Sequence, residues 1–344
     1  MPHMAHWEHN YSLLRHNTFG IDAIASSFVT YHSIDDLQDV VRDLSHMPQT
    51  PLLHIGGGSN LLFTRNFDGV VIHSAISDIT PLEQADSVLV RVGAAVVWDD
   101  LVDRCVKQGY YGIENLSLIP GEVGAAAVQN IGAYGAEVAD VIESVEAVSL
   151  IDGSIRSFTA AECGYGYRKS VFKSSLKGKY AITHVNLRLS KQFVPNLSYS
   201  GLLQNLKQQG VSDSNITASK VRQTIIEIRR AKLPDPQHIG NAGSFFINPV
   251  VTQEKWNSLK AEFPLIPHYP VDNGLVKIPA GWLIEQCGWK GKSLGRAGVY
   301  SKQALVLVNL GGASGEEILN LCHAIQADVK AKFNIEISPE VNIL

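Results

Sequence analysis

The order of the expected elements predicts an α+β fold for this chain. Strand-like and helix-like segments do not alternate steadily, as they would in a doubly wound α/β protein. From about residue 69 the pattern changes to many short strands with one or two helices, and the last third mixes strands with helices. The chain has 344 residues, 45% of them hydrophobic. It is therefore long enough for about two or three domains with cores of their own.

A small β/α unit built around a glycine loop is expected near the N-terminus. Ser33 and Asp36 have the spacing of a capping box and open a predicted helix. The apolar stripe of this helix consists of Leu37, Val40, Val41 and Leu44. Short strands are predicted at 52–55 and 61–63, on either side of the run Gly56-Gly57-Gly58-Ser59-Asn60.

The middle of the chain is predicted to be rich in strands. The expected elements are strands at 70–72 and 88–97, a helix at 99–108 ended by Gly109, a hairpin of 144–151 and 154–159 across the two-residue turn Asp152-Gly153, and a half-buried strand at 182–189.

A predicted helix at 217–231 is closed by Pro234, and we place a domain boundary there. Further helices are expected near 254–262, 280–287 and 315–333, followed by a terminal strand at 334–343. Ser314 and Glu317 have capping-box spacing, which explains the glycine-rich run before the last helix as a structural turn.

Composition excludes several classes of function. The net charge is −4 and no block of Lys or Arg occurs, so nucleic acid is not expected as a partner. The four cysteines are scattered without a C-x-x-C motif, so no zinc site or dithiol is expected. No apolar stretch approaches the about 18 residues of a membrane span, and the N-terminus does not resemble a signal peptide. We therefore expect a soluble cytoplasmic protein.

The N-terminus carries His3, His6 and His9 at three-residue spacing. This spacing is compatible with metal binding, but a frayed terminus is the more usual interpretation.

Two loops of small residues are candidates for binding an anion or a flat ligand. The three glycines of 56–60 let successive backbone N–H groups converge, and Ser59 and Asn60 add side-chain donors. The loop matches neither a Walker motif nor G-x-G-x-x-G, and a tight turn between strands is the alternative. Residues 116–135 are apolar and dense in Gly and Ala, which suits close approach to a ligand. A core helix at 123–128 is the alternative there.

Three polar residues lie in unusual sequence settings. Arg168 lies among aromatic residues and glycines, although a solvated or ion-paired arginine is the ordinary interpretation. Ser244 lies between a flexible turn and two phenylalanines, although most such serines cap or turn the chain. Glu340 lies inside a strand-like run close to the C-terminus, where a surface glutamate is the default.

Taken together, the chain resembles the UDP-N-acetylenolpyruvoylglucosamine reductases (UDP-N-acetylmuramate dehydrogenases). The resemblance runs from 17 to 341 through the motifs NTFG at 17, GGGSN at 56, IPGEVGAAAVQNIGAYG at 119, GYRKSVF at 166, KLPDP at 232, NAGSFFINP at 241 and PEV at 339. Tyr199 looks like the tyrosine loop of the longer form of this family.

The resemblance implies a two-lobed FAD-binding domain of the vanillyl-alcohol-oxidase (PCMH) type and an α+β substrate-binding domain. The implied bounds are 1–70 with the C-terminal strand 331–344 for the first lobe, 71–221 for the second lobe, and 222–330 for the substrate-binding domain.

The resemblance also implies the site residues. Arg168, Ser244 and Glu340 would be catalytic. The residues implied to bind FAD without a covalent link are Gly56, Gly57, Gly58, Ser59, Asn60, Ile119, Pro120, Gly121, Gly124, Asn130, Gly132, Ala133, Tyr134 and Tyr167. The candidates for binding the UDP-sugar are Tyr199, Lys232 and Asn248, together with Arg229 and Gln303. No metal is implied, and a monomer is expected.

The implied reaction is a step in making the bacterial cell-wall precursor. Hydride would pass from flavin N5 to the enolpyruvyl CH₂ carbon, with NADPH as the reductant of the flavin. Arg168 would stabilise the charge that develops on the substrate carboxylate. Glu340 would donate a hydrogen bond as a protonated acid, and Ser244 would deliver a proton to the α-carbon.

One position departs from the family pattern, and two alternatives remain open. Many relatives carry arginine where this chain has Asn342. A flavin oxidase of the same superfamily is one alternative, although neither small-residue loop holds a His or Cys that could tether flavin. A non-catalytic flavin or nucleotide-sugar binding protein is the other, and such a binder would not need the three polar residues named above.

Overall fold

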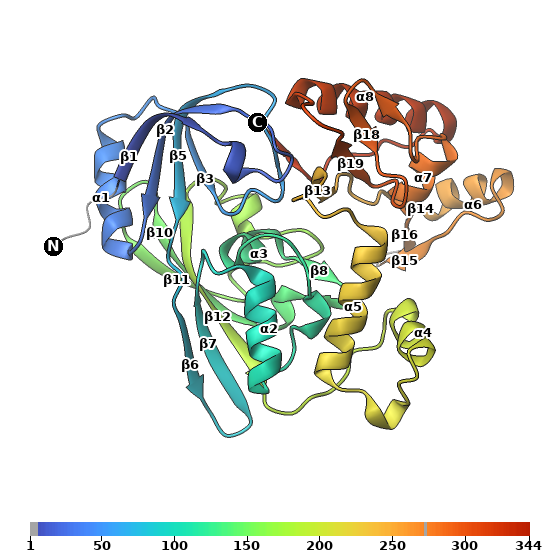
Figure 1. The fold of residues 1–344 in the computed structure, drawn as a ribbon, viewed down its shortest axis with the longest axis horizontal. Coiled ribbons are helices and arrows are strands. Elements are labelled where there is room, and N and C mark those ends of the chain that lie inside the picture. Colours follow the sequence, from blue (N-terminus) through green and yellow to red (C-terminus); the bar gives the residue numbers. More distant parts are fainter. Residues whose placement is uncertain (1–5, 272–273) are drawn as a thin grey trace. The chain divides into compact units, whose positions relative to one another are not determined.

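The computed structural model describes residues 6–271 and 274–344. Within this part the chain forms two compact units (Figure 1). The first unit comprises 6–11, 25–57 and 68–229, and the second comprises 12–24, 58–67, 230–271 and 274–344. The three-part division expected from the sequence, with bounds near 70, 221 and 330, stays a prediction.

The largest sheet in the described part of the first unit has five antiparallel strands, with the long strands side by side in Figure 1. Its order is β11 (Ile155–Thr159), β10 (Ile142–Ser149), β12 (Tyr180–Ser190), β7 (Ser87–Gly93) and β6 (Ile79–Glu83). The apolar face of the sheet packs against α2 (Trp98–Gln108) and α3 (Val123–Gln129) in one continuous core. On the other face Arg91 donates hydrogen bonds to both carboxylate oxygens of Glu146, and β12 is buried along most of its length.

The second sheet of this unit has the order β1 (His6–Ser12), β2 (Ile24–Tyr31), β5 (Phe67–Ser74) and β3 (Leu52–Ile55). Strands β3 and β5 run parallel, with His54 opposite Ile72. His6 and His9 lie in the ordered strand β1, so the expectation of a frayed terminus is wrong for them, while His3 lies outside the described residues. No group of three or more metal-binding side chains occurs within the described ranges.

Two predicted helix ends in the first unit are confirmed, the start of α1 (Ile34–Ser45) and the end of α2. Ser33 caps α1 by accepting a hydrogen bond from Asp36 N–H. The Asp36 carboxylate accepts from His32 N–H, so the reciprocal half of the expected capping box is shifted by one residue. Gly109 ends α2 in the left-handed conformation, as predicted. Helix α4 (Ser200–Gln208) was not expected, and α5 spans Ala218–Lys232.

The second unit combines small sheets with the helices α6 (Gln253–Glu262), α7 (Ala280–Gln286) and α8 (Gly315–Phe333). One sheet has the order β13 (Gly240–Ser244), β19 (Val306–Asn309), β18 (Ala297–Val299) and β17 (Ser293–Leu294), and another has β14 (Val250–Thr252), β16 (Leu275–Lys277) and β15 (Tyr269–Val271). The predicted capping box of Ser314 and Glu317 opens α8, which packs on β18 and β19 (Figure 1).

Two sequence predictions need correction. Ser149 N–H donates to Ser154 O, so the β10–β11 hairpin closes over residues 150–153 rather than over two residues. The predicted terminal strand at 334–343 is only β20 (Asn342–Ile343), which pairs in parallel with β4 (Leu61–Leu62). Pro339 has no N–H to donate, and only an isolated bridge to Phe246 forms there.

Candidate active site

The glycine loop crosses from the first unit to the second between Gly57 and Gly58. Gly58 has a φ of +66°, and a Cβ on it would lie 1.9 Å from His16 O, so only glycine fits. Thr18 N–H donates to Gly58 O at 3.2 Å. The Thr18 hydroxyl oxygen is buried there without a hydrogen-bond partner. A buried orphan hydroxyl beside a glycine loop fits a site whose ligand, such as the implied FAD, supplies the missing partner.

The second small-residue segment is part helix and part loop. Residues 123–129 form α3, so the core-helix interpretation is right for this stretch. A Cβ on Gly124 would lie 2.8 Å from Ala94 Cβ, so this glycine allows α3 to pack closely on the sheet. Asn130 and Tyr134 then take left-handed φ angles of +46° and +50°. The chain therefore turns sharply after α3, and the carbonyls of Asn130, Gly132 and Tyr134 along this turn accept side-chain hydrogen bonds.

Asn130 organises this turn through its side chain. Its Oδ1 accepts from Ala139 N–H at 3.1 Å, and its Nδ2 donates to Glu137 Oε2 at 2.8 Å and to Gly166 O at 2.9 Å. The last bond ties the small-residue loop to the turn that carries Arg168.

Arg168 occupies a strained position in a tight turn. Gly166 and Lys169 exchange both backbone hydrogen bonds, and Arg168 between them has a φ of +53°. Non-glycine residues rarely adopt this conformation, and such strain is concentrated at functional sites. Its Nη1 donates to Asn130 O at 3.2 Å and its Nη2 to Gly132 O at 2.8 Å. The guanidinium therefore lies in a fixed orientation beside the small-residue loop.

Ser244 is exposed at the end of β13, next to an irregularity in the strand. The register of β13 against β19 shifts between Asn241 and Ser244, and Gly243 has a φ of +69°. Asn241 Oδ1 accepts from Gly243 N–H at 2.9 Å and stabilises this bulge. Phe245 is fully buried directly after the serine. The bulge and the buried ring together set the direction of the serine side chain.

Glu340 lies beside the same strand segment. Glu340 N–H donates to Phe245 O at 2.8 Å, and Pro339 bridges to Phe246. The residue is half-buried, which differs from the surface glutamate that its sequence position suggests by default. The second unit thus brings Ser244 and Glu340 together, whereas Arg168 belongs to the first unit and is described only within it.

The predicted UDP-sugar residues form two groups and one separate position. In the first unit, Tyr199 packs edge-on against Tyr134 with ring centroids 5.0 Å apart. Arg229 donates to Leu118 O at 3.1 Å. Burial lowers the pKa of its guanidinium, and the neighbouring Tyr134 acts in the opposite direction.

In the second unit, Asn248 Oδ1 accepts a hydrogen bond from Ala280 N–H at 2.9 Å. Gln303 Oε1 lies 3.2 Å from the Cβ position of Gly281, so both residues meet the start of α7. Lys232 is the exposed last residue of α5.

The remaining predicted FAD residues lie in the small-residue segment 116–135, except Tyr167, which lies in the turn that carries Arg168. Ile119 packs on the core of the first unit, and Pro120 is exposed. Gly121 has a φ of +110°, and its carbonyl accepts a hydrogen bond from Trp98 N–H. Gly132 and Ala133 form the short strand β8, and the centre of the Tyr167 ring lies 5.4 Å from Arg168 Cζ.

Sequence reasoning missed two residues that shape these loops. Leu118 has a φ of +57°, held by a hydrogen bond from its N–H to Asp99 Oδ1, and no sequence signal predicts a left-handed leucine. Glu122 directs its carboxylate at Gly56 and Gly57. A charged residue inside an otherwise apolar, small-residue segment was the available signal.

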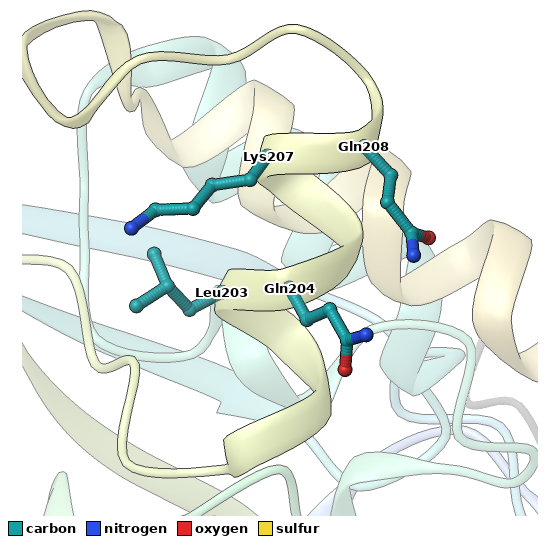
Figure 2. A pocket seen from close by; sticks show the side chains of 4 residues that line it. All are labelled: Leu203, Gln204, Lys207 and Gln208. Atoms are coloured by element: carbon teal, nitrogen blue, oxygen red, sulfur yellow. The ribbon is translucent and has the colours of Figure 1, made fainter.

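A shallow surface hollow beside α4 does not belong to this site. Figure 2 shows its lining side chains, Leu203, Gln204, Lys207 and Gln208, projecting from successive turns of the helix. None of the predicted site residues contributes to it. No helix within 6–271 and 274–344 is long and apolar enough to cross a membrane.

Comparisons with known proteins agree with this geometry. A family profile described as an FAD binding domain matches residues 25–159. A second profile, described as the C-terminal domain of UDP-N-acetylenolpyruvoylglucosamine reductase, matches residues 235–344. The fold and the site therefore define an FAD-dependent oxidoreductase with an α+β fold, as the sequence predicts.

Relatives that align with nearly the whole chain identify the family within this class of oxidoreductases. The chain is 52% identical over 338 residues to UDP-N-acetylenolpyruvoylglucosamine reductase of Bacteroides fragilis, covering 98% of this chain and 100% of the relative. It is 48% identical to the enzyme of the same name from Porphyromonas gingivalis, covering 97% and 98%. The chain belongs to the UDP-N-acetylenolpyruvoylglucosamine reductase family. The crystal structure of the Thermus caldophilus reductase shares the fold, with a TM-score of 0.67 at 23% identity and 98% coverage of both chains.

Proposed function

We propose that this enzyme reduces UDP-N-acetylglucosamine enolpyruvate to UDP-N-acetylmuramate, with NADPH as the reductant of non-covalently bound FAD. The proposed location is the cytoplasm and the proposed state is a monomer. The observation that supports the proposal is the backbone hydrogen bond from Glu340 N–H to Phe245 O, which joins the chain at Glu340 to the residue that follows Ser244. Bound FAD would supply the hydride that reaches the terminal CH₂ carbon of the enolpyruvyl ether.

Arg168 and Glu340 stabilise the charge that then develops on the substrate carboxylate. Arg168 is a permanently charged planar donor, and the carbonyls of Asn130 and Gly132 hold its orientation before substrate binds. A preorganised donor of this kind needs no rearrangement as the charge develops. Glu340 assists as a protonated acid, since an ionised carboxylate beside a forming enediolate would raise the barrier.

Ser244 delivers the proton that completes the reduction. A serine is a weak acid, but an enolate carbon is strongly basic, so the hydroxyl needs no prior activation. Its exposure at the end of β13 leaves the hydroxyl accessible to a ligand. The bulge at Gly243 fixes its direction and thereby the face of the alkene that receives the proton.

The candidates for contact with the UDP-sugar offer groups suited to its different parts. Tyr199 offers an exposed aromatic face in the first unit, and Lys232 offers a positive charge for the diphosphate. Asn248 and Gln303 provide amide groups near the start of α7. Local groups of this kind are required because the net charge of the whole chain is −4.

The visible spectrum of the purified protein tests this function. We expect flavin bands that bleach with NADPH under anaerobic conditions and return when the enolpyruvyl UDP-sugar is added. Acid precipitation should release the colour into solution. Flavin that stays in the protein pellet, or reduced protein that oxygen reoxidises quickly and the sugar does not, would identify an oxidase instead.

A further inference from the structure

The side chain of Glu122 is directed at the glycine loop. Glu122 is the N-cap residue of α3, yet its carboxylate makes no capping hydrogen bond. A Cβ on Gly56 would lie 2.9 Å from Glu122 Oε2, and a Cβ on Gly57 would lie 3.4 Å from Oε1. The carboxylate therefore occupies the space that side chains at 56 and 57 would need. All three residues belong to the first unit.

The imidazole of His73 pairs with this carboxylate and carries the opposite charge when it is protonated. Its Nε2 lies 3.5 Å from Glu122 Oε1, and the two side chains are 18% and 13% exposed. A carboxylate so far removed from water is costly unless a charge or hydrogen bonds compensate it. Behind His73, burial and the charge of His73 lower the pKa of His54 to about 4, so His54 is neutral at pH 7. Tyr31 Oη lies 3.0 Å from His54 Nε2, so the polar side chains of Glu122, His73 and His54 are followed by that of Tyr31 in strand β2.

We propose that Glu122, paired with His73, is a positioning residue that holds Gly56 and Gly57 in the backbone conformation that binds FAD. The inference rests on the proposal that the glycine loop holds FAD. The carboxylate supports the loop by contact, and His73 balances its charge. An unbalanced carboxylate beside the loop would oppose the anionic diphosphate of the cofactor. Both the contact and the balance of charge are therefore needed.

The contact is tested by a double-mutant cycle on FAD affinity. Apoprotein variants are titrated with FAD, and the dissociation constant is read from quenching of flavin fluorescence. Glu122→Ala and Gly56→Ala are each expected to weaken FAD binding at least about tenfold. In the double variant the alanine methyl enters the space that the carboxylate leaves, so it should bind FAD more tightly than Gly56→Ala alone. Equal or weaker binding by the double variant would refute the contact.

The charge balance is tested without changing the loop. His73→Gln should weaken FAD binding at least about tenfold, and adding Glu122→Gln should restore most of the loss, since the unpaired charge is then gone. This arm decides the proposal if Gly56→Ala does not fold. No effect of His73→Gln, or no recovery in the double variant, would overturn the inference.

The control is Glu162→Gln, an exposed carboxylate of the same unit that bonds Thr159 and Arg156. Its FAD affinity should match that of the unmodified protein. If the unmodified protein itself binds no FAD, the proposed function fails. If it binds FAD and all the Glu122 and His73 variants bind equally well, only the present inference fails.

Discussion

The side chain of Asn60 donates a hydrogen bond to the backbone carbonyl of Glu340, with 3.2 Å between Nδ2 and the oxygen. In return, Asn60 O accepts from the backbone N–H of Asn342 at 3.1 Å and from its side-chain Nδ2 at 3.2 Å. The last residue of the glycine loop and the chain around Glu340 thus hold each other in place. The side-chain amide of Asn342 supports the backbone of Glu340 through Asn60.

Asn342→Ala should therefore weaken both stability and turnover. The substitution removes one side-chain hydrogen bond and keeps the backbone pairing of β20, so the free energy of unfolding should fall by about 1 kcal/mol. We expect kcat to fall several-fold with a smaller change in KM, as measured by denaturant unfolding and steady-state kinetics. Asn257→Ala, at an exposed position of α6, is the control. Lower stability with unchanged kcat would limit Asn342 to a structural role.

Arg168→Lys should reduce turnover more than substrate affinity. Lysine keeps the charge but cannot donate to Asn130 O and Gly132 O as a planar fork. We expect kcat to fall at least about tenfold, because the lost interaction is strongest in the transition state. Arg156→Lys is a matched control, because Arg156 also lies over an aromatic ring, 4.2 Å from the centroid of Phe158. Turnover close to that of the control would remove Arg168 from the catalytic group.

Substitutions of Glu340 distinguish a neutral donor from a charged group. If Glu340 donates a hydrogen bond as an acid, Glu340→Gln can partly replace it and should keep more activity than Glu340→Ala or Glu340→Asp. Loss of one such donor in Ala typically costs about 10²–10³-fold in kcat. The three variants are compared by single-turnover reoxidation of the reduced enzyme, with Glu336→Gln, an exposed glutamate, as the control. A Gln variant as inactive as Ala would contradict the protonated glutamate.

Local signals predicted those parts of the fold that depend on local physics. Ser314 with Glu317 opens α8 and Gly109 ends α2, because caps act over three or four residues and need no tertiary context. The terminal strand was predicted too long for the opposite reason. Ile335 and Ile337 alternate and are buried as in a strand, but ladder pairing also needs a partner strand, and only Asn342 and Ile343 have one in β4.

Sequence motifs identified the candidate site residues, but no motif predicted their geometry. No propensity predicts a left-handed Arg168, because this conformation is imposed by the turn from Gly166 to Lys169 and by two distant carbonyls. The partnership of Glu122 with Gly56 joins residues far apart in the chain, so neither sequence segment shows it alone. Such long-range contacts become visible only in the folded chain.

Ser244→Ala separates the two halves of the proposed reaction. Reduction by NADPH needs no proton on carbon, whereas reoxidation by the enolpyruvyl sugar does. Alanine fits where serine did, and the bulge is held by Asn241 and Gly243, so the fold should survive. Loss of a positioned acid typically slows proton transfer about 10²–10⁴-fold. Rapid mixing should therefore show near-normal bleaching by NADPH and reoxidation slowed by at least about a hundredfold.

Each other result of this experiment assigns Ser244 a different role. Slowing of both halves would mean that the serine shapes the site that NADPH and the sugar use in turn, because a proton donor affects only the second half. Slowing of neither half would mean that another group or a water supplies the proton. Ser258→Ala, at an exposed position on α6, should leave both rates unchanged. Only the selective loss of reoxidation, with this control unaffected, identifies the hydroxyl at the end of β13 as the acid.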